Sequence, residues 1–286
     1  MTPSPLADLT TDFDRNLQSL SLAEKLAMER LLDAELQQER LIAQILRKPS
    51  SLLNSVGGAD PWQAELLKSW FPRMLLLCTR QGGKSSVAAA IAIKTALAER
   101  GSLTLLLSPT QRQSSELFRD KVMRLYNTIG KPVPIVQESA LTMTLATGSR
   151  IVALPGDEET IRGYSGVKLL VLDEAARISD ELYRSVRPML AVSQGRLIAL
   201  STPFGRRGWF FEEWSGSNEW KRVKIQANQC PRISPAFLAE ERAALGERWY
   251  RQEYEVSFED TIAALFAYED LAASLRSDVP TMVLPE

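Results

Sequence analysis

The sequence contains no histidine and only two cysteines, Cys78 and Cys230, among its 286 residues. Without histidine, Ser-His and Cys-His catalysis and histidine-based metal centres are excluded. The two cysteines make neither a metal-binding spacing nor a disulfide framework, which suits a reducing cytoplasm. The sequence also lacks an apolar run of the ~20 residues that a membrane-spanning helix needs. Its first residues, 1–14, carry no basic segment, so we expect no secretory signal.

Charge of either sign is not in excess, since 34 basic and 35 acidic residues give a formal net charge of −1. Contact with nucleic acid would therefore have to use a local patch or a ring of subunits. One basic cluster lies near Trp209 and Trp214, and we expect a solvated face there more than a DNA contact. This basic cluster consists of Arg206, Arg207, Lys221, Arg222 and Lys224.

The composition, 45% hydrophobic and 24% charged, is typical of a globular chain with one large domain and an appendage. A capping box at Ser21 and Glu24 opens a helical stretch that Pro49 ends. The Ser/Gly-rich residues 50–58 indicate a linker. We therefore predict an N-terminal helical segment with its linker (1–57), a main domain (58–262) and a C-terminal stub (263–286).

Beyond the linker, short apolar runs alternate with helical patterns. We predict strands at 74–78, 103–107, 169–172, 197–200 and 221–225, a hairpin at 142–145 and 149–154, and helices at 86–100, 111–129 and 180–190. Apolar strands separated by helices form a mainly parallel sheet with helices on both faces, an α/β fold. Ligands in such sheets bind at the carboxyl ends of the strands, and the polar clusters below follow those ends.

The segment CTRQGGKS, residues 78–85, matches the phosphate-loop pattern G-x-x-x-x-G-K-[ST] except that cysteine replaces the first glycine. Gly82 and Gly83 allow successive backbone N–H groups to point at phosphate oxygens, beside the positive end of the next helix. We expect Lys84 to bridge the β- and γ-phosphates and Ser85 to ligate Mg²⁺. A chance surface turn is the alternative, but the motif follows an apolar strand and opens a helix, as a phosphate loop must.

A second apolar strand ends in two acids, Asp173 and Glu174. Asp173 is expected to hold Mg²⁺ directly or through water, and Glu174 to orient and deprotonate the attacking water. A strand end followed by a helix-capping aspartate is a common alternative. With the phosphate loop upstream, the pair predicts that the protein binds a nucleoside triphosphate and hydrolyses it.

Polar side chains follow two other predicted strands. Ser108 and Thr110 either sense the γ-phosphate or cap a helix or turn, and the sequence favours neither role. For Ser201 and Thr202 we favour the sensing role, because their strand is expected beside the acidic one.

Three residues outside the strand ends are also candidates. Gln63 is placed to read the Watson–Crick edge of adenine, with Trp62 stacking nearby, although Trp62 alone is at least as well explained by packing its helix onto the sheet. Arg162 beside a glycine is either a finger that reaches a neighbouring subunit's γ-phosphate or a loop salt bridge.

Taken in order, these segments resemble the large subunit of tailed-phage terminases, the DNA-packaging motor. An arginine within the phosphate loop is characteristic of that family, so the cysteine at position 78 weakens the match little. The resemblance covers about residues 58–270. It rests on DPWQ (60–63), CTRQGGKS (78–85), LSPTQRQSSELF (107–118), IRGYSG (161–166), VLDEAA (171–176), LSTPFGRRGWFFEEW (200–214) and WYRQEYEVSFED (249–260).

The resemblance implies a P-loop NTPase fold of the additional-strand, catalytic-glutamate type, with ATP and Mg²⁺ as cofactors. It also implies a pentameric ring docked on the portal protein of a procapsid, with the small terminase subunit as a partner and double-stranded DNA as cargo. Such a motor works in the host cytoplasm, transiently at the procapsid portal, and has no membrane partner.

The resemblance assigns roles residue by residue. Gln63 becomes the adenine contact, with Trp62 kept as the nearby stacking candidate, and Ser201 and Thr202 match the motif that couples hydrolysis to movement. Ser85 and Asp173 become metal ligands. The catalytic candidates are Glu174, Arg80 as a second cation of the loop, and Arg162 acting in trans. The phosphate contacts are Arg80, Gln81, Gly82, Gly83, Lys84, Ser85 and Ser86.

One departure from the family is large. Its members carry a C-terminal nuclease domain with clustered acidic metal ligands, and this sequence ends at Glu286, soon after that domain should begin. We therefore expect no nuclease activity from this chain. Two alternatives to a packaging motor stay open: a helicase-like ATPase that moves on nucleic acid, and a non-catalytic nucleotide-binding assembly protein from a prophage remnant. A helicase would need a second motor domain, and intact Lys84, Asp173 and Glu174 argue against a decayed site.

Overall fold

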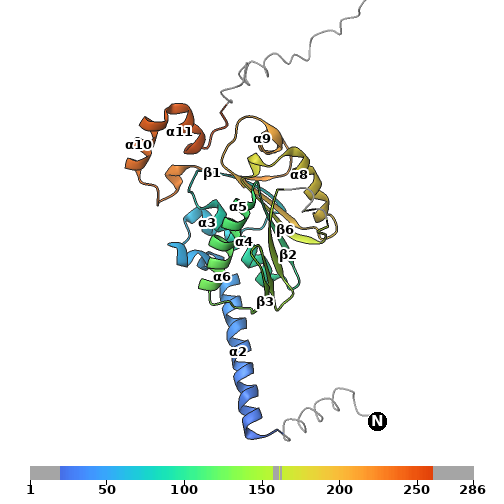
Figure 1. Cartoon of the computed structure of the whole chain (residues 1–286). Coiled ribbons are helices and arrows are strands. Elements are labelled where there is room, and N and C mark those ends of the chain that lie inside the picture. Colours follow the sequence, from blue (N-terminus) through green and yellow to red (C-terminus); the bar gives the residue numbers. More distant parts are fainter. Residues whose placement is uncertain (1–19, 157–160, 162, 260–286) are drawn as a thin grey trace, which may run out of the picture. The chain divides into compact units, whose positions relative to one another are not determined.

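The structure is a computed structural model that describes residues 20–156, 161 and 163–259 (Figure 1). The chain divides into two compact units at the junction of Lys48 and Pro49. Among the described residues, none of the helices has both the length and the apolar character needed to cross a bilayer.

The N-terminal unit contains α2 (Leu22–Arg47), a helix of 26 residues that starts at a capping box. The Ser21 hydroxyl accepts a hydrogen bond from the Glu24 N–H at 3.3 Å, and the Glu24 carboxylate accepts one from the Ser21 N–H at 2.8 Å. These bonds satisfy two backbone donors that a helix start otherwise leaves unpaired. The predicted N-terminal helix is therefore confirmed, and it ends just before Pro49.

The second unit begins with a 3₁₀ helix, η1 (Pro49–Val56), where the sequence predicted a linker. Leu52 and Leu53 are fully buried, so this segment is part of the core. The serines and glycines around it suggested a flexible connection, but the leucine pair outweighs them because burying two leucines stabilises the segment against chain entropy. Gly57 and Gly58 then adopt positive φ angles of 95° and 86°, which end the helix.

Within the described residues, eight strands form one sheet in the order β3-β4-β5-β2-β6-β7-β1-β8. The strands are β1 (Arg73–Cys78), β2 (Leu103–Ser108), β3 (Ile135–Glu138), β4 (Thr142–Leu145), β5 (Arg150–Pro155), β6 (Val167–Asp173), β7 (Arg196–Ser201) and β8 (Lys221–Ile225). Only the β3–β4 and β4–β5 pairs are antiparallel; the other pairs are parallel. The predicted mainly parallel sheet is confirmed, with β3 as an edge strand that the sequence did not reveal.

The register of the central strands brings the polar strand ends to one edge of the sheet. Asp173 of β6 pairs with Leu200 of β7, and Ser201 of β7 pairs with Leu77 of β1. The phosphate loop follows β1, the acidic pair follows β6, and the serine ends β7. Three polar clusters that are far apart in the sequence therefore lie at adjacent strand ends.

Helices cover both faces of the sheet, as an α/β fold requires. In this unit they are α3 (Pro61–Lys68), α4 (Lys84–Ala98), α5 (Gln111–Glu116), the π-helix η2 (Leu117–Met123), α6 (Arg124–Thr128), η3 (Ala175–Arg177), α8 (Asp180–Val186), η4 (Arg187–Leu190), α9 (Gly208–Ser215), η5 (Ala227–Gln229), α10 (Pro235–Leu245) and α11 (Glu247–Glu253). Figure 1 shows α3 to α6 on one side of the sheet and α8 and α9 on the other. The helix predicted at 111–129 is thus present, but a π-helical segment interrupts it.

The face covered by α8 and α9 carries an aromatic core. The rings of Tyr183 and Trp209 stack with their centroids 3.8 Å apart, and Phe210 meets Trp209 edge-on. The Trp209 indole N–H donates to the carbonyl of Ile178 at 3.0 Å, which satisfies the one polar atom of this buried side chain. This packing joins α8, which follows β6, to α9, which follows β7, close to the polar strand ends.

Candidate active site

The loop between β1 and α4 has the backbone shape of a phosphate loop. Gln81 and Gly83 lie in the left-handed region, with φ of 57° and 95°, and Lys84 begins α4 directly afterwards. A Cβ on Gly83 would stand 2.5 Å from Nε2 of Gln63 and 3.0 Å from Nη2 of Arg232. The positive φ therefore favours glycine, and a side chain here would also displace the ends of Gln63 and Arg232. Backbone N–H groups are left at the start of a helix, where anions bind.

Cys78, which replaces the usual first glycine, is a packing residue of the loop. A Cβ on Gly82 would stand 2.8 Å from the Cys78 sulfur and 3.0 Å from Cγ2 of Thr79. The thiol is fully buried, and burial raises the pKa of Cys78 to about 12. The side chain is therefore a neutral thiol at physiological pH, and it fills the space that Gly82 leaves open.

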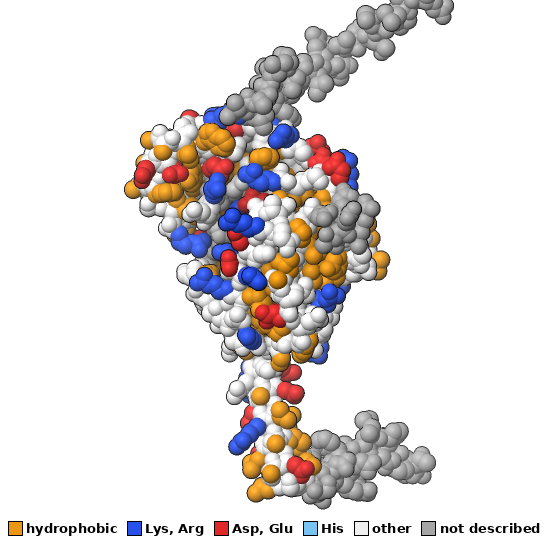
Figure 2. Space-filling view, viewed as in Figure 1, with side chains coloured by type: hydrophobic (Ala, Val, Ile, Leu, Met, Phe, Trp, Pro, Cys, Tyr) orange, Lys and Arg blue, Asp and Glu red, His pale blue; other side chains and the backbone are white. Residues whose placement is uncertain are grey.

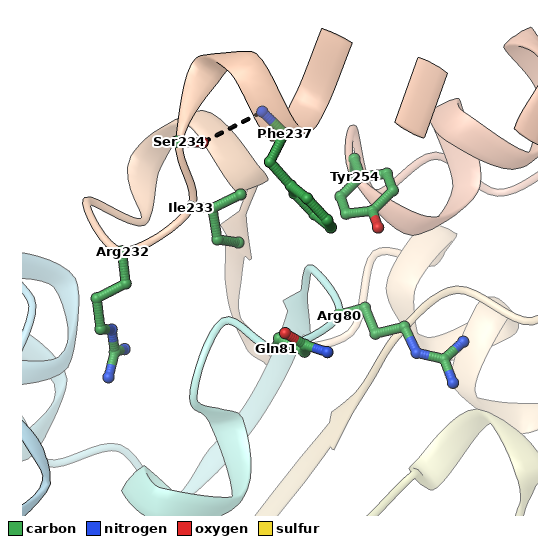
Figure 3. Close-up of a pocket in the computed structure, with 7 residues that line it drawn as sticks. All are labelled: Arg80, Gln81, Arg232, Ile233, Ser234, Phe237 and Tyr254. Carbon is green, nitrogen blue, oxygen red and sulfur yellow. Dashed lines mark hydrogen bonds between the residues drawn. The ribbon is translucent and has the colours of Figure 1, made fainter. Parts of the chain in front are cut away.

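The first half of the loop is anchored to the C-terminal helices of the unit. The Thr79 hydroxyl donates to the carbonyl of Glu253 at 2.9 Å, and the Arg80 N–H donates to the same carbonyl at 3.2 Å. The Arg80 guanidinium lies 3.7 Å from the Glu253 carboxylate, with 67% of its side chain exposed. Figure 3 shows it pointing away from Gln81 and Arg232, beside a cavity of about 250 Å³ roofed by Phe237 and Tyr254.

Four predicted residues converge where the phosphate loop meets β6. Nζ of Lys84 lies 2.8 Å from Oε1 of Glu174, and the Ser85 hydroxyl donates to Oδ2 of Asp173 at 3.2 Å. The Glu174 N–H donates to the other Asp173 oxygen at 3.1 Å. Glu174 itself has φ 52° and ψ 42°, a left-handed conformation that costs a non-glycine residue about 1 kcal/mol or more and recurs at functional sites.

The electrostatics of this group are those of a buried cation between two acids. Burial raises the pKa of Asp173 to about 6, although the charge of Lys84 and the Ser85 hydrogen bond oppose the shift. For Lys84, burial favours the neutral amine, but the charges of Glu174 and Asp173 together outweigh it and raise its pKa. Lys84 is therefore a stable cation, and Asp173 is a buried carboxyl group whose ionised form is incompletely compensated.

Two cavities meet at this group, and they differ in charge. The cationic cavity, of about 600 Å³, is lined by the side chains of Lys84, Lys121, Arg124 and Arg232, and by no carboxylate from the described residues. The acidic cavity, of about 380 Å³, is lined by Glu116, Asp120, Asp173 and Glu174. Ser85 and Lys121 line both. Figure 2 shows basic side chains gathered over α3, α5 and α6 on the visible face, with a few acidic ones among them.

The segment that precedes β1 braces the phosphate loop. Oε1 of the buried Gln63 accepts from the Asp60 N–H at 2.8 Å, and its Nε2 donates to the Gly83 carbonyl at 3.5 Å. Asp60 also forms an ion pair with Arg232 at 2.8 Å. Trp62 is partly buried in the same helix. Gln63 thus touches the loop itself, while base recognition by Gln63 and Trp62 stays a prediction.

The residues after β7 contact the chain that carries Glu174. The Ser201 hydroxyl accepts from the Ala176 N–H at 3.2 Å, and Thr202 is buried. Arg177 lies 3.9 Å from the Glu174 carboxylate and also stacks over the Phe204 ring, 4.2 Å from its centroid. These contacts join the segment that carries Glu174 to the segment that follows β7, while a coupling role for Ser201 and Thr202 stays a prediction.

Two further predicted hydroxyls, those of Thr110 and Ser108, differ in their surroundings, and Arg222 of the basic cluster has contacts of its own. Thr110 caps α5, since its hydroxyl accepts from the Gln113 N–H at 3.3 Å. The buried Ser108 hydroxyl has no hydrogen-bond partner among the described residues. In the basic cluster, Arg222 donates to backbone carbonyls at the end of α9, those of Glu213 and Gly216 included, and so braces a turn. Arg162 lies outside the described residues.

Sequence reasoning missed three cations of the site: Lys121, Arg124 and Arg232. A polar stripe of Gln113, Lys121 and Arg124 at helical spacing could have suggested the first two. Arg232 follows β8 in an irregular segment, and its contact with Asp60 joins residues that are 172 positions apart. No local pattern in the sequence reveals such a contact.

The family model for the terminase large subunit, T4-like virus type, N-terminal, matches residues 75–273. The chain belongs to this family. Its fold is that of the ATPase domain of the large terminase from Thermus phage P74-26, with 22% identity and a TM-score of 0.58 over 68% of this chain and 92% of that chain. The comparison with curated proteins gave no match.

Whole large terminases share the fold with this terminase chain over part of their length. The enzyme of HK97 bacteriophage is 15% identical, with a TM-score of 0.56 over 69% of this chain and 50% of its own. The enzyme of a thermophilic bacteriophage, solved in complex with ATP-gamma-S, is 12% identical, with a TM-score of 0.58 over 70% of this chain and 52% of its own. The chain thus spans about half the length of these two terminases.

Proposed function

We propose that this terminase chain hydrolyses ATP with Mg²⁺ and uses the energy to drive double-stranded DNA into a procapsid. The observation that carries the proposal is the convergence of Lys84, Ser85, Asp173 and Glu174 at one edge of the sheet, between a cationic and an acidic cavity. Family membership supports it, and so does the ATP-gamma-S complex of the thermophilic phage terminase.

The residues of the site fit Mg-ATP. A serine hydroxyl beside a carboxylate is an oxygen donor set of the kind that Mg²⁺ takes together with phosphate oxygens and water. Bound Mg²⁺ would neutralise charge that builds up between the β- and γ-phosphates. Ser85 and Asp173 would hold it, and the ionised Asp173 would gain the compensation that it lacks in its buried position. Gly82 and Gly83 would present backbone N–H groups to the phosphates.

Glu174 serves as the general base that takes a proton from the attacking water. In the structure its carboxylate is held by Lys84 at 2.8 Å, so it is not yet available for that role. A phosphate chain competes for the same ammonium group, and the exchange of partners releases the base. Lys84 thereby links the occupancy of the phosphate site to the availability of Glu174.

The finer assignments rest on family membership. We propose a pentameric ring on the portal protein, the small terminase subunit as a partner, Arg162 acting in trans, and transient work at the portal in the host cytoplasm. Coupling through Ser201 and Thr202 is supported by the Ser201–Ala176 hydrogen bond. The expected lack of nuclease activity stays a prediction, which incubation of the chain with plasmid DNA and Mn²⁺ would test.

A steady-state ATPase assay tests the central proposal, with and without Mg²⁺, DNA and portal protein. Mg²⁺-dependent turnover by the wild type that Lys84→Ala abolishes is the expected result. Glu240→Gln, an exposed substitution on α10, serves as the matched control. Nucleotide binding without turnover under every condition would favour an assembly protein. Strong stimulation by DNA with no further effect of portal would favour a helicase-like ATPase.

A further inference from the structure

Two of the four cations of the cationic cavity, Lys121 and Arg124, come from one helical stretch that contains neither the phosphate loop nor a strand end. Lys121 is the fifth residue of the π-helix η2 and is half-buried, while Arg124 begins α6 and is exposed. Both line the cavity that also contains Lys84 and Ser85. Nothing in the phosphate-loop or acidic motifs accounts for these two side chains.

The π-helix explains how both reach the cavity. A π-turn takes more residues than an α-turn, so it shifts the side chains that follow it around the helix axis, and such segments are frequent at functional sites. Residues before the shift, Gln113 and Glu116, line the acidic cavity, Lys121 lines both, and Arg124 after it lines only the cationic one. One helical stretch thus supplies acids to one cavity and cations to the other.

Neither cation has a counter-ion within the part of the chain that the structure describes. Among the described residues, no carboxylate lies within ion-pair distance of the Lys121 ammonium or the Arg124 guanidinium. Arg112, one turn before η2 on the same stretch, is paired with Glu116 at 2.8 Å, and Arg242 is paired with both Glu247 and Glu255. Two unpaired cations beside a lysine and a serine of the phosphate loop form a site for several negative charges held close together.

We infer that Lys121 and Arg124 bind the phosphate chain of the nucleotide from the side opposite the phosphate loop. The inference rests on the proposed function and deepens it, since it adds two positioning residues that the family motifs do not contain. Lys121 also lines the acidic cavity, so it lies where the phosphate and water sites meet.

Binding of inorganic tripolyphosphate and of ATP to the full chain, measured by calorimetry at two salt concentrations, tests this inference. Each charge-assisted contact that is lost weakens binding, so we expect Lys121→Gln/Arg124→Gln to bind both ligands at least about tenfold more weakly. The affinity of this double variant should depend less steeply on salt concentration than that of the wild type. Replacing Lys121→Gln by Lys121→Arg in the double variant should restore part of the lost affinity. Arg119→Gln, exposed in the same π-helix and outside both cavities, is the matched control and should bind like the wild type.

Several outcomes separate this inference from the proposed function. If the wild type binds neither ligand, the proposed function fails. If Lys84→Ala weakens binding and the Lys121/Arg124 double variant does not, only the present inference is overturned. Loss of affinity for a DNA duplex with unchanged tripolyphosphate binding would likewise overturn it, because the two cations would then contact DNA phosphates. An equal loss in Arg119→Gln would show a structural effect of the helix and would also overturn it.

Discussion

The phosphate loop has a cation–carboxylate pair on each side, and the two pairs differ in almost every respect. Lys84 and Glu174 are 2.8 Å apart, with only 11% and 20% of their side chains exposed. Arg80 and Glu253 are 3.7 Å apart, and 67% of the arginine side chain is exposed. The loop therefore carries one tight, largely buried pair at its second half and one loose, solvated pair at its first half.

The difference in burial assigns the two pairs different roles. A largely buried charge is costly without a partner, so Lys84 must be matched either by Glu174 or by something else with negative charge, such as a phosphate. A solvated pair contributes little because water and salt screen it. The first half of the loop is instead held by backbone hydrogen bonds from Thr79 and Arg80 to the Glu253 carbonyl. Lys84 is thus suited to exchange Glu174 for a phosphate group, whereas the Arg80–Glu253 pair lies where backbone hydrogen bonds already hold the loop.

Removing the acid of the tight pair should have the largest effect. We expect Glu174→Gln to lower kcat for ATP hydrolysis by ~10²–10⁴-fold, the usual contribution of a general base. ATP binding should be retained or become tighter, because Lys84 no longer has a competing carboxylate. Single-turnover kinetics and the Kd for ATP measure the two effects separately. A kcat within twofold of the wild type would contradict the assignment of Glu174 as the base.

Near the buried Lys84–Glu174 pair, the Asp173 carboxyl should make the stability of the protein depend on pH. Its folded-state pKa of about 6 lies above the ordinary 3.8, so the folded protein holds this proton more tightly than the unfolded chain does. As pH rises from about 4 to about 6, the group therefore lowers the free energy of unfolding, by roughly 2 kcal/mol. In EDTA, urea unfolding of the wild type and of Asp173→Asn at pH 4.5 and pH 7 measures this.

The two proteins should differ most at the higher pH. The stability of Asp173→Asn relative to the wild type should increase between pH 4.5 and pH 7, because the substituted side chain cannot ionise. If the difference in stability between Asp173→Asn and the wild type is the same at pH 4.5 and pH 7, Asp173 has an ordinary pKa in the folded protein.

Packing at the start of the loop should give a smaller effect. Gly82→Ala places a Cβ 2.8 Å from the Cys78 sulfur, and such overpacking typically costs about 1–3 kcal/mol. In a Cys78→Ala background the cost should fall, although not to zero, because Thr79 Cγ2 and the Thr79 carbonyl also lie within 3.2 Å. Urea unfolding of the four proteins forms a double-mutant cycle. If the two substitutions change the free energy of unfolding additively, the Cys78 sulfur does not restrict the size of the side chain at position 82.

How well the sequence predicted the two sides of the loop depends on the range of the contacts. Lys84, Ser85, Asp173 and Glu174 were predictable because each follows an apolar strand, and parallel strands bring their ends together. The anchor at Glu253 and the Arg232 contact were not, because they depend on where α10 and α11 pack after the sheet has formed. The polar stripe could have suggested that Lys121 lies on an exposed helix face, but its place in the cavity also depends on a π-helical shift, which the sequence pattern does not reveal.

The same distinction applies to the fold. The central strands are apolar on both faces and stand out in the sequence, whereas β3 has three exposed residues out of four and resembles a loop. The segment at η1 was misread for the opposite reason, since two buried leucines lie among serines and glycines. Both errors arise where a few long-range contacts decide the structure of a short segment.

The smallest effect is expected at the loose pair. Arg80→Ala should change the free energy of unfolding by no more than about 0.5 kcal/mol, because the pair is long and solvated. Because the guanidinium lies outside both the cationic and the acidic cavity, kcat and KM of the isolated chain should change less than threefold. Urea unfolding and steady-state ATPase kinetics measure both, with Arg119→Ala as the exposed control. A tenfold loss of kcat at unchanged stability would show instead that Arg80 turns toward the nucleotide during the reaction, and the two sides of the loop would then share the catalytic work.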